Sequence, residues 1–247
     1  MNNDVVLQTL ERQFSLNKET AKVLVVGLGK TGLSVAYYLR RLGLQFAIVD
    51  SRDKPPFNDN LLAEMPDIPV FTGGFDETVF SVATHIIVSP GISMEEPLIK
   101  RAIARGVCLF SDIDLFACSV NEPVVAITGS NGKSTVTTML GAMAKADDRR
   151  VAVGGNLGTP ALDLLADDID LYILELSSFQ LERTPQLKPV AATVLNVSAD
   201  HLDRYDSIDD YAEQKCKIYH GNGVMLINAD DPYVSAMQES NRETLTF

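Results

Sequence analysis

Short apolar runs alternate with stretches of helical pattern along most of this 247-residue chain. Nearly continuous apolar runs of four to eight residues are typical of strands that are buried on both faces of a parallel sheet. The predicted strands are residues 23–28, 46–50, 70–72, 85–89 and 107–110 in the first half, and 124–128, 151–154, 171–176, 190–197 and 224–228 in the second. The predicted helices include residues 31–42, 134–146 and 208–219. The alternation predicts an α/β fold in both halves, with parallel sheets covered by helices.

The weakest pattern lies at residues 117–123, which contain Ser119, Asn121 and Pro123 between two predicted strands. A boundary there divides the chain into a domain of residues 1–118 and a domain of residues 119–247. The run at 224–228 is the last predicted strand, and no helix start is evident in the residues that follow it. The second domain is therefore expected to be incomplete.

Charge and cysteine content exclude several classes of protein. The formal net charge is −12, from 21 Lys and Arg against 33 Asp and Glu, so the surface repels nucleic acid and anionic membranes. No apolar run reaches membrane-spanning length, and Asp4, Glu11 and Glu19 interrupt any secretory leader. The three cysteines are widely spaced, which is typical of reduced thiols in the cytoplasm and not of a disulfide framework or a zinc site.

A glycine-rich turn follows the first predicted strand. Gly27, Gly29 and Gly32 form G-x-G-x-x-G at the start of a helix, and Asp50 ends the next strand 23 positions after Gly27. This context is typical of binding the diphosphate of a nucleotide at the helix N-terminus, although a tight turn that binds nothing has the same pattern. Two further segments end strands where ligands of such sheets bind, or are ordinary loops: Ser51 with Arg52, and Ser89-Pro90-Gly91.

A second glycine-rich turn is the strongest signal in the chain. Residues 124–128 predict a strand, and the segment after it opens a helix: Thr128-Gly129-Ser130-Asn131-Gly132-Lys133-Ser134-Thr135. This is the pattern of a phosphate loop, in which backbone N–H groups cradle phosphates, Lys133 neutralises their charge and Ser134 binds magnesium. ATP or GTP is the predicted ligand. The loop is a shortened variant, because Ile127 stands where the general pattern has glycine.

Polar residues follow the later strands. Glu175 ends an apolar strand, where a buried carboxylate needs a partner such as magnesium, unless it reaches solvent at the sheet edge. His201, flanked by Asp200 and Asp203, could ligate a second metal or contact phosphate, or lie in an ordinary polar loop. Asn156 follows Gly154-Gly155 and could be simple turn chemistry. Lys215 lies in a predicted helix, where lysine is usually solvated.

Together, the two glycine turns and two further strings resemble the Mur ligases of bacterial cell-wall synthesis. The strings are Glu-Leu-Ser-Ser-Phe-Gln-Leu-Glu at 175–182 and Asp-His-Leu-Asp-Arg-Tyr at 200–205. The form Thr-Gly-x-Asn-Gly-Lys-Ser/Thr resembles the phosphate loop of that family and accounts for Ile127. The first string favours the D-glutamate-adding branch over the L-alanine-adding one.

The resemblance implies a Rossmann-like N-terminal domain, residues 1–118, that binds the UDP part of UDP-N-acetylmuramoyl-L-alanine. The positions in this domain that match the substrate contacts of the family are Lys30, Thr31, Asp50, Ser51, Arg52, Ser89, Pro90 and Gly91. Asn156, in the second domain, matches a residue near the substrate and the phosphate. It also implies a central ATP-binding domain, residues 119–247, with ATP at Gly129, Ser130, Asn131, Gly132, Lys133, Ser134 and Thr135. Lys133, His201 and Lys215 are the implied catalytic residues, and the implied Mg²⁺ ligands are Ser134, Glu175, His201 and Lys215, the last as a carbamate.

The implied reaction is phosphoryl transfer from ATP to the substrate carboxylate, which gives an acyl phosphate that the amine of D-glutamate attacks to form an amide. Complete members of the family are roughly twice as long, with a third domain of typical size that binds D-glutamate. We expect these 247 residues to lack that domain, and we expect this chain alone, a cytoplasmic monomer, to be an inactive fragment of the ligase. Two alternatives remain from the residues themselves: an NAD-dependent dehydrogenase, and a nucleotide-binding switch without chemistry of its own.

Overall fold

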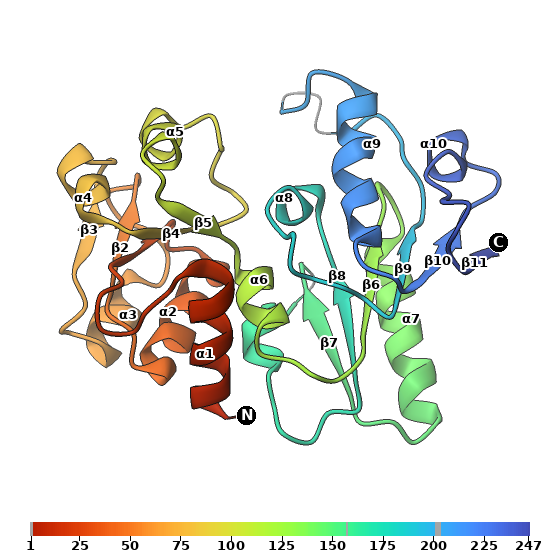
Figure 1. The fold of residues 1–247 in the computed structure, drawn as a ribbon, viewed down its shortest axis with the longest axis horizontal. Coiled ribbons are helices and arrows are strands. Elements are labelled where there is room, and N and C mark those ends of the chain that lie inside the picture. Colours follow the sequence, from red (N-terminus) through yellow and green to blue (C-terminus); the bar gives the residue numbers. More distant parts are fainter. Residues whose placement is uncertain (1, 157, 201–203) are drawn as a thin grey trace. The chain divides into compact units, whose positions relative to one another are not determined.

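The computed structural model describes residues 2–156, 158–200 and 204–247. The chain divides into two compact units, Met1–Cys118 and Ser119–Phe247, and each is described here by itself. Each unit contains one all-parallel sheet with helices on its faces, so the predicted α/β fold with two parallel sheets is confirmed (Figure 1). None of the helices among the described residues is long and apolar enough to cross a membrane.

Unit 1 has a five-stranded sheet in the order β3-β2-β1-β4-β5. Its strands are β1 (Val23–Val26), β2 (Phe46–Asp50), β3 (Val70–Thr72), β4 (His85–Val88) and β5 (Cys108–Phe110). Its helices are α1 (Asn3–Phe14), α2 (Lys30–Leu42), α3 (Asn58–Glu64), α4 (Glu77–Val82), α5 (Pro97–Ala104) and α6 (Asp112–Ala117). Residues of α4 and α5 pack with Leu24, Val26 and Val49 in one apolar cluster on one face of the sheet.

Unit 2 has a six-stranded sheet in the order β11-β10-β9-β6-β8-β7. Its strands are β6 (Val124–Thr128), β7 (Val151–Gly155), β8 (Leu171–Glu175), β9 (Ala191–Val194), β10 (Val224–Ile227) and β11 (Thr244–Thr246). Its α-helices are α7 (Lys133–Ala146), α8 (Ser178–Leu181), α9 (Ile208–Cys216) and α10 (Pro232–Ser235), and the 3₁₀ turns are η1 (Ala161–Leu164) and η2 (Lys217–Tyr219). Figure 1 shows α7 on one side of this sheet, and α8 and α9 on the other.

The predicted elements agree with the structure to within a few residues, and the end of the chain differs from the prediction. The run at 224–228 is not the last strand, because β11 adds three residues to the sheet beside β10. A helix start was also missed: the Asp231 side chain accepts hydrogen bonds from the backbone N–H groups of Tyr233 and Val234 and caps α10. The strand predicted at 190–197 is shorter, since β9 ends at Val194. Its last predicted residues instead form part of the site.

Candidate functional site

The first glycine turn joins β1 to α2 at the carboxyl edge of the unit 1 sheet. Gly27 has φ +98°, and a Cβ on Gly32 would lie 1.9 Å from the carbonyl oxygen of Gly27, so the helix start packs directly on the turn. No side chain caps the N-terminus of α2. The N-cap residue is Gly29, which has no side chain to cover the helix start, and an uncapped helix N-terminus is a typical anion site.

Both carboxylate oxygens of Asp50 accept hydrogen bonds from groups of the protein itself. One carboxylate oxygen accepts from the backbone N–H of Leu28 at 2.7 Å, and Arg52 donates to both oxygens at 2.6–2.9 Å. Burial alone raises the pKa of Asp50, but these hydrogen bonds and the charge of Arg52 outweigh it and lower the pKa below its ordinary value. A carboxylate held this way is not available to a ribose hydroxyl, which counts against the dinucleotide interpretation of this motif.

The other predicted contacts of unit 1 lie along the same edge. Ser89 follows β4, and its hydroxyl donates to the carbonyl oxygen of Gly27 at 2.9 Å. Strands β1 and β4 are neighbours in the sheet. After β1 the chain continues to β2 on one side, and after β4 it continues to β5 on the other side. Open α/β sheets bind ligands at the carboxyl ends of two such strands. Lys30 and Thr31 begin α2, Ser51 and Arg52 follow β2, and Pro90 and Gly91 follow Ser89. The fold thus gathers these predicted residues around the turn.

The phosphate loop of unit 2 connects β6 to α7. Gly129 and Gly132 have φ +154° and +80°, values that residues with side chains rarely adopt. The N–H groups of Ser130 and Asn131 donate to the Asn196 backbone oxygen at 2.9 Å and to its side-chain oxygen at 2.8 Å. These two amides are therefore used within the protein. The amides left for phosphate are those of the first turn of α7, which no side chain caps.

A buried carboxylate lies beside this loop. Glu175 ends β8, is only 2% exposed, and accepts from the Ser134 hydroxyl and from the Asn156 side-chain amide, each at 2.8 Å. Among the described residues, no lysine or arginine forms an ion pair with it. A buried anion that is held only by neutral donors is incompletely compensated, and one carboxylate with a hydroxyl and phosphate oxygens is how Mg²⁺ is usually bound. These residues therefore fit Mg²⁺.

Lys133 and Lys215 meet at one backbone carbonyl. The Lys133 ammonium donates to the carbonyl oxygens of Gly129 and Ser130 at 2.8 and 2.9 Å. The Lys215 amine, on α9, donates to the carbonyl of Gly129 at 2.9 Å and lies 4.3 Å from the centre of the Tyr211 ring. Lys215 is 1% exposed; burial first, and then the charge of Lys133, lower its pKa to about 7. The expectation of a solvated lysine, which the residues alone favoured, is wrong.

His201 lies outside the described residues. Among the residues that the structure describes, no three His, Cys, Asp or Glu side chains gather into a metal cluster. The structure brings together Lys133, Ser134, Asn156, Glu175 and Lys215 around the phosphate loop.

Sequence reasoning missed three residues that hold the loop in place. The Ser198 hydroxyl accepts a hydrogen bond from the Asn131 side-chain amide. The Ser130 hydroxyl donates to the Ser198 carbonyl oxygen and accepts from the Ser198 N–H. The Tyr211 hydroxyl lies 3.4 Å from the Ser130 hydroxyl. Asn196 is the third. The available signal was the position of Asn196 and Ser198, just after the end of a strand.

Two family models match this chain. Residues 21–111 match the N-terminal domain of MurD-like Mur ligases, and residues 127–247 match the Mur ligase middle domain. The chain belongs to the Mur ligase family. Members of this family use ATP and Mg²⁺.

Curated relatives of this Mur ligase chain carry one activity in their names. This chain is 51% identical over 227 residues to a UDP-N-acetylmuramoylalanine–D-glutamate ligase of Methylococcus capsulatus, and the match covers 92% of this chain and 50% of the relative. It is 55% identical over 208 residues to the ligase of the same name from Pseudomonas aeruginosa, covering 84% of this chain and 46% of the relative. The chain therefore spans about half the length of the curated relatives that it matches.

A solved structure shows the same fold at low identity. The UDP-N-acetylmuramate:L-alanyl-γ-D-glutamyl-meso-diaminopimelate ligase of Neisseria meningitides matches with a TM-score of 0.62 at 16% identity. The match covers 92% of this Mur ligase chain and 78% of the other.

Proposed function

We propose that this chain carries the substrate-binding and ATP-binding domains of a D-glutamate-adding Mur ligase of peptidoglycan synthesis. The single observation that carries the proposal is the buried Glu175 carboxylate, held by Ser134 and Asn156 beside the loop that contains Lys133. The identity of 51–55% to ligases named for D-glutamate supports the choice of amino acid. Three free cysteines support a cytoplasmic location, and a monomer is the expected state.

In this proposal, residues 1–118 bind the UDP part of UDP-N-acetylmuramoyl-L-alanine at the first glycine turn. The amides at the start of α2 face the diphosphate, with Lys30 and Thr31 beside them. Arg52 and Asp50 hold each other and the turn in shape, and Ser89 fixes its other side. Their role is to keep the diphosphate site preformed.

Residues 119–247 bind ATP at the phosphate loop, and Ser134 and Glu175 hold Mg²⁺. When bound, Mg²⁺ offsets charge as the γ-phosphate approaches the substrate carboxylate. Lys133 turns from the carbonyls of Gly129 and Ser130 toward the phosphate oxygens and adds its positive charge there. The carboxylate oxygen attacks the γ-phosphorus, ADP leaves and an acyl phosphate forms; the amine of D-glutamate then displaces phosphate. His201 is proposed to serve a second metal.

Lys215 is proposed to react with carbon dioxide. Its pKa of about 7 leaves a large part of the side chain as the free amine near neutral pH. The amine nitrogen forms a bond to the carbon of CO₂ and loses one proton, which gives an anionic carbamate. Carbamate oxygens are ligands that Mg²⁺ accepts, and the buried position excludes most competing water.

The test is calorimetric titration of UDP-N-acetylmuramoyl-L-alanine into the chain, with NAD titrated in parallel. Saturable binding of the UDP compound without NAD binding supports the proposal; NAD binding alone refutes it. A second titration follows ATP with Mg²⁺ in Glu175→Gln, for which we expect at least tenfold weaker binding, and Glu243→Gln, an exposed acid of the same unit, is the control. We expect no useful D-glutamate ligation by this chain alone, and substrate-dependent phosphate release would contradict that expectation.

A further inference from the structure

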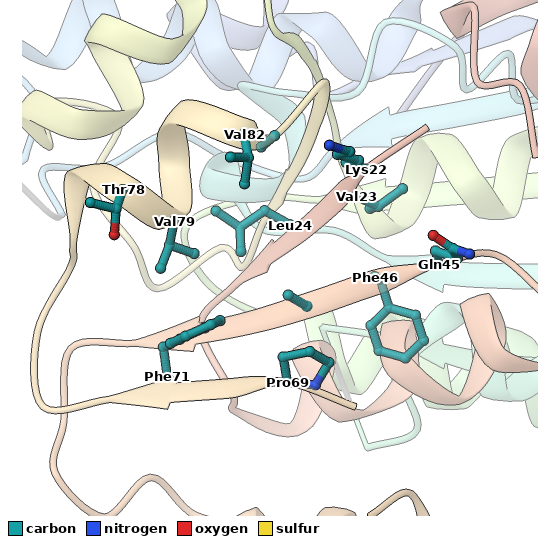
Figure 2. A pocket seen from close by; sticks show the side chains of 12 residues that line it. Lys22, Val23, Leu24, Gln45, Phe46, Pro69, Phe71, Thr78, Val79 and Val82 are labelled. Atoms are coloured by element: carbon teal, nitrogen blue, oxygen red, sulfur yellow. The ribbon is translucent and has the colours of Figure 1, made fainter. Parts of the chain in front are cut away.

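A recess lies on the unit 1 sheet at the amino ends of β1 and β2, on the face that α4 covers (Figure 2). Its volume is about 420 Å³, and residues from β1, β2 and α4 line it, together with Pro69, which precedes β3, and Phe71, the middle residue of β3. That volume is within the range of sites that bind small organic molecules. The glycine turn, Arg52 and Ser89 lie at the carboxyl ends of strands of the same sheet, so this recess is separate from the proposed UDP site.

Helix α4, which has six residues, covers this face of the sheet only in part. Leu24, which is 2% exposed, and its register partner Ala47, which is only partly buried, line the recess on the sheet. At the rim, Phe71 is 42% exposed and Val82 is 59% exposed.

One end of the recess is polar. Lys22 and Gln45 precede β1 and β2, and Figure 2 shows their side chains at the end that lies away from Thr78. Both side chains are exposed, and Lys22 is the one charged residue among the twelve that line the recess. Within the described part of the chain, neither the Lys22 ammonium nor the Gln45 amide group has a hydrogen-bond or ion-pair partner. This end offers a positive charge and an amide donor to a ligand.

We propose that this recess binds a small free amphipathic carboxylate of the medium-chain fatty acid type. Its carboxylate lies against Lys22 and Gln45, and its apolar chain runs over Leu24, Ala47 and Phe71 toward α4. Lys22 disfavours a cationic ligand, and a fully apolar ligand leaves the two donors unused. A folded protein partner fits poorly, because twelve residues line the recess and a standard protein interface takes about 20–30 on each side.

The test is titration of decanoate into the whole 247-residue chain, followed by calorimetry and by backbone amide NMR shifts. We expect saturable binding with shifts at Lys22, Gln45 and Phe71. Ala47→Phe fills the recess and should weaken binding at least tenfold. Lys22→Met should weaken it by up to about fivefold, the upper limit for an exposed ion pair, and neutral decanamide should bind the unchanged chain about as weakly. Lys54→Met, which removes an exposed lysine beyond the carboxyl end of β2, should have no effect.

The proposal has a second variant, because Ala47→Phe could disturb the sheet. Val82→Glu places a negative charge at the exposed rim without filling the core, and it too should weaken binding of an anionic ligand. Absence of saturable decanoate binding, or unchanged affinity in a folded Ala47→Phe and in Val82→Glu, overturns the proposal. A concentration-dependent dimer that Val82→Glu dissociates would identify a second copy as the occupant and overturn it as well. None of these outcomes depends on UDP-substrate or ATP binding, so the proposed function is tested separately.

Discussion

Replacing Asp50 tests whether its role is to hold the first glycine turn. The Leu28 N–H that it accepts is completely buried, and in Asp50→Ala that donor has no acceptor, which destabilises a protein by about 1–3 kcal/mol. The ion pair with Arg52 contributes no more than about 1 kcal/mol, because the Arg52 side chain is 50% exposed. We expect Asp50→Ala to lower the free energy of unfolding of unit 1 by about 2–3 kcal/mol.

Asp50→Asn separates the two contributions. The amide oxygen still accepts from Leu28 and the charge is lost, so the expected decrease is about 1 kcal/mol. Because the two units need not unfold together, the measurement is native-state hydrogen exchange of the β1 and β2 amides by mass spectrometry. Asp53→Asn, an exposed acid nearby, is the control. A decrease below 0.5 kcal/mol in Asp50→Ala, or equal losses in both variants, would refute the assignment of the main contribution to the Leu28 N–H.

The same residue predicts a pH dependence. Since the folded-state pKa of Asp50 is lower than its unfolded value, its contribution to stability is complete above the unfolded pKa of about 4. The contribution is lost as the pH falls from there through the folded-state pKa. Unit 1 of the unchanged chain should therefore lose stability more steeply below pH 4 than unit 1 of Asp50→Asn.

Two further predictions concern the contact of Gly32 with the Gly27 carbonyl and the carbamate proposed at Lys215. Gly32→Ala should destabilise unit 1 by about 1–3 kcal/mol or more, because its Cβ meets the Gly27 carbonyl, whereas Gly29→Ala, which meets nothing within 4 Å, should have little effect in the same exchange experiment. With ¹³C-labelled bicarbonate, a carbamate NMR signal should grow as the pH rises through about 7, the pKa of Lys215, and should vanish in Lys215→Met but not in Lys145→Met. No carbamate signal at pH 8 would contradict the proposed role of Lys215.

The sequence predicted the elements whose apolar residues are buried on both faces. Strands such as β2 and β6 have the predicted bounds, because a continuous apolar run followed by a turn admits few alternatives. Helix α4 was not predicted, because six residues are too few to show a helical period. Strand β11 contains only Thr244-Leu245-Thr246 and forms by pairing with β10, which no local pattern indicates.

In the candidate site too, local sequence predicted some residues, whereas others depend on contacts between distant segments. Lys133 and Ser134 follow from the phosphate-loop motif, and Glu175 follows from its position at the end of a predicted strand. The bonds from Asn196 to the phosphate loop depend on β9 lying beside β6, and the order of strands in the sheet is not written in any local segment. The low pKa of Lys215 depends on burial against the loop by α9, a tertiary contact that a helical pattern does not reveal.

The contacts of Asn196 and Ser198 with the phosphate loop have a thermodynamic consequence. A loop that becomes ordered only on its ligand loses about 1–2 kcal/mol of backbone conformational freedom for each residue that is fixed. Here Ser130 and Asn131 are fixed by neighbouring residues when the chain folds. Nucleotide binding then involves little loss of loop entropy, and the binding free energy of the phosphates remains available for orienting them.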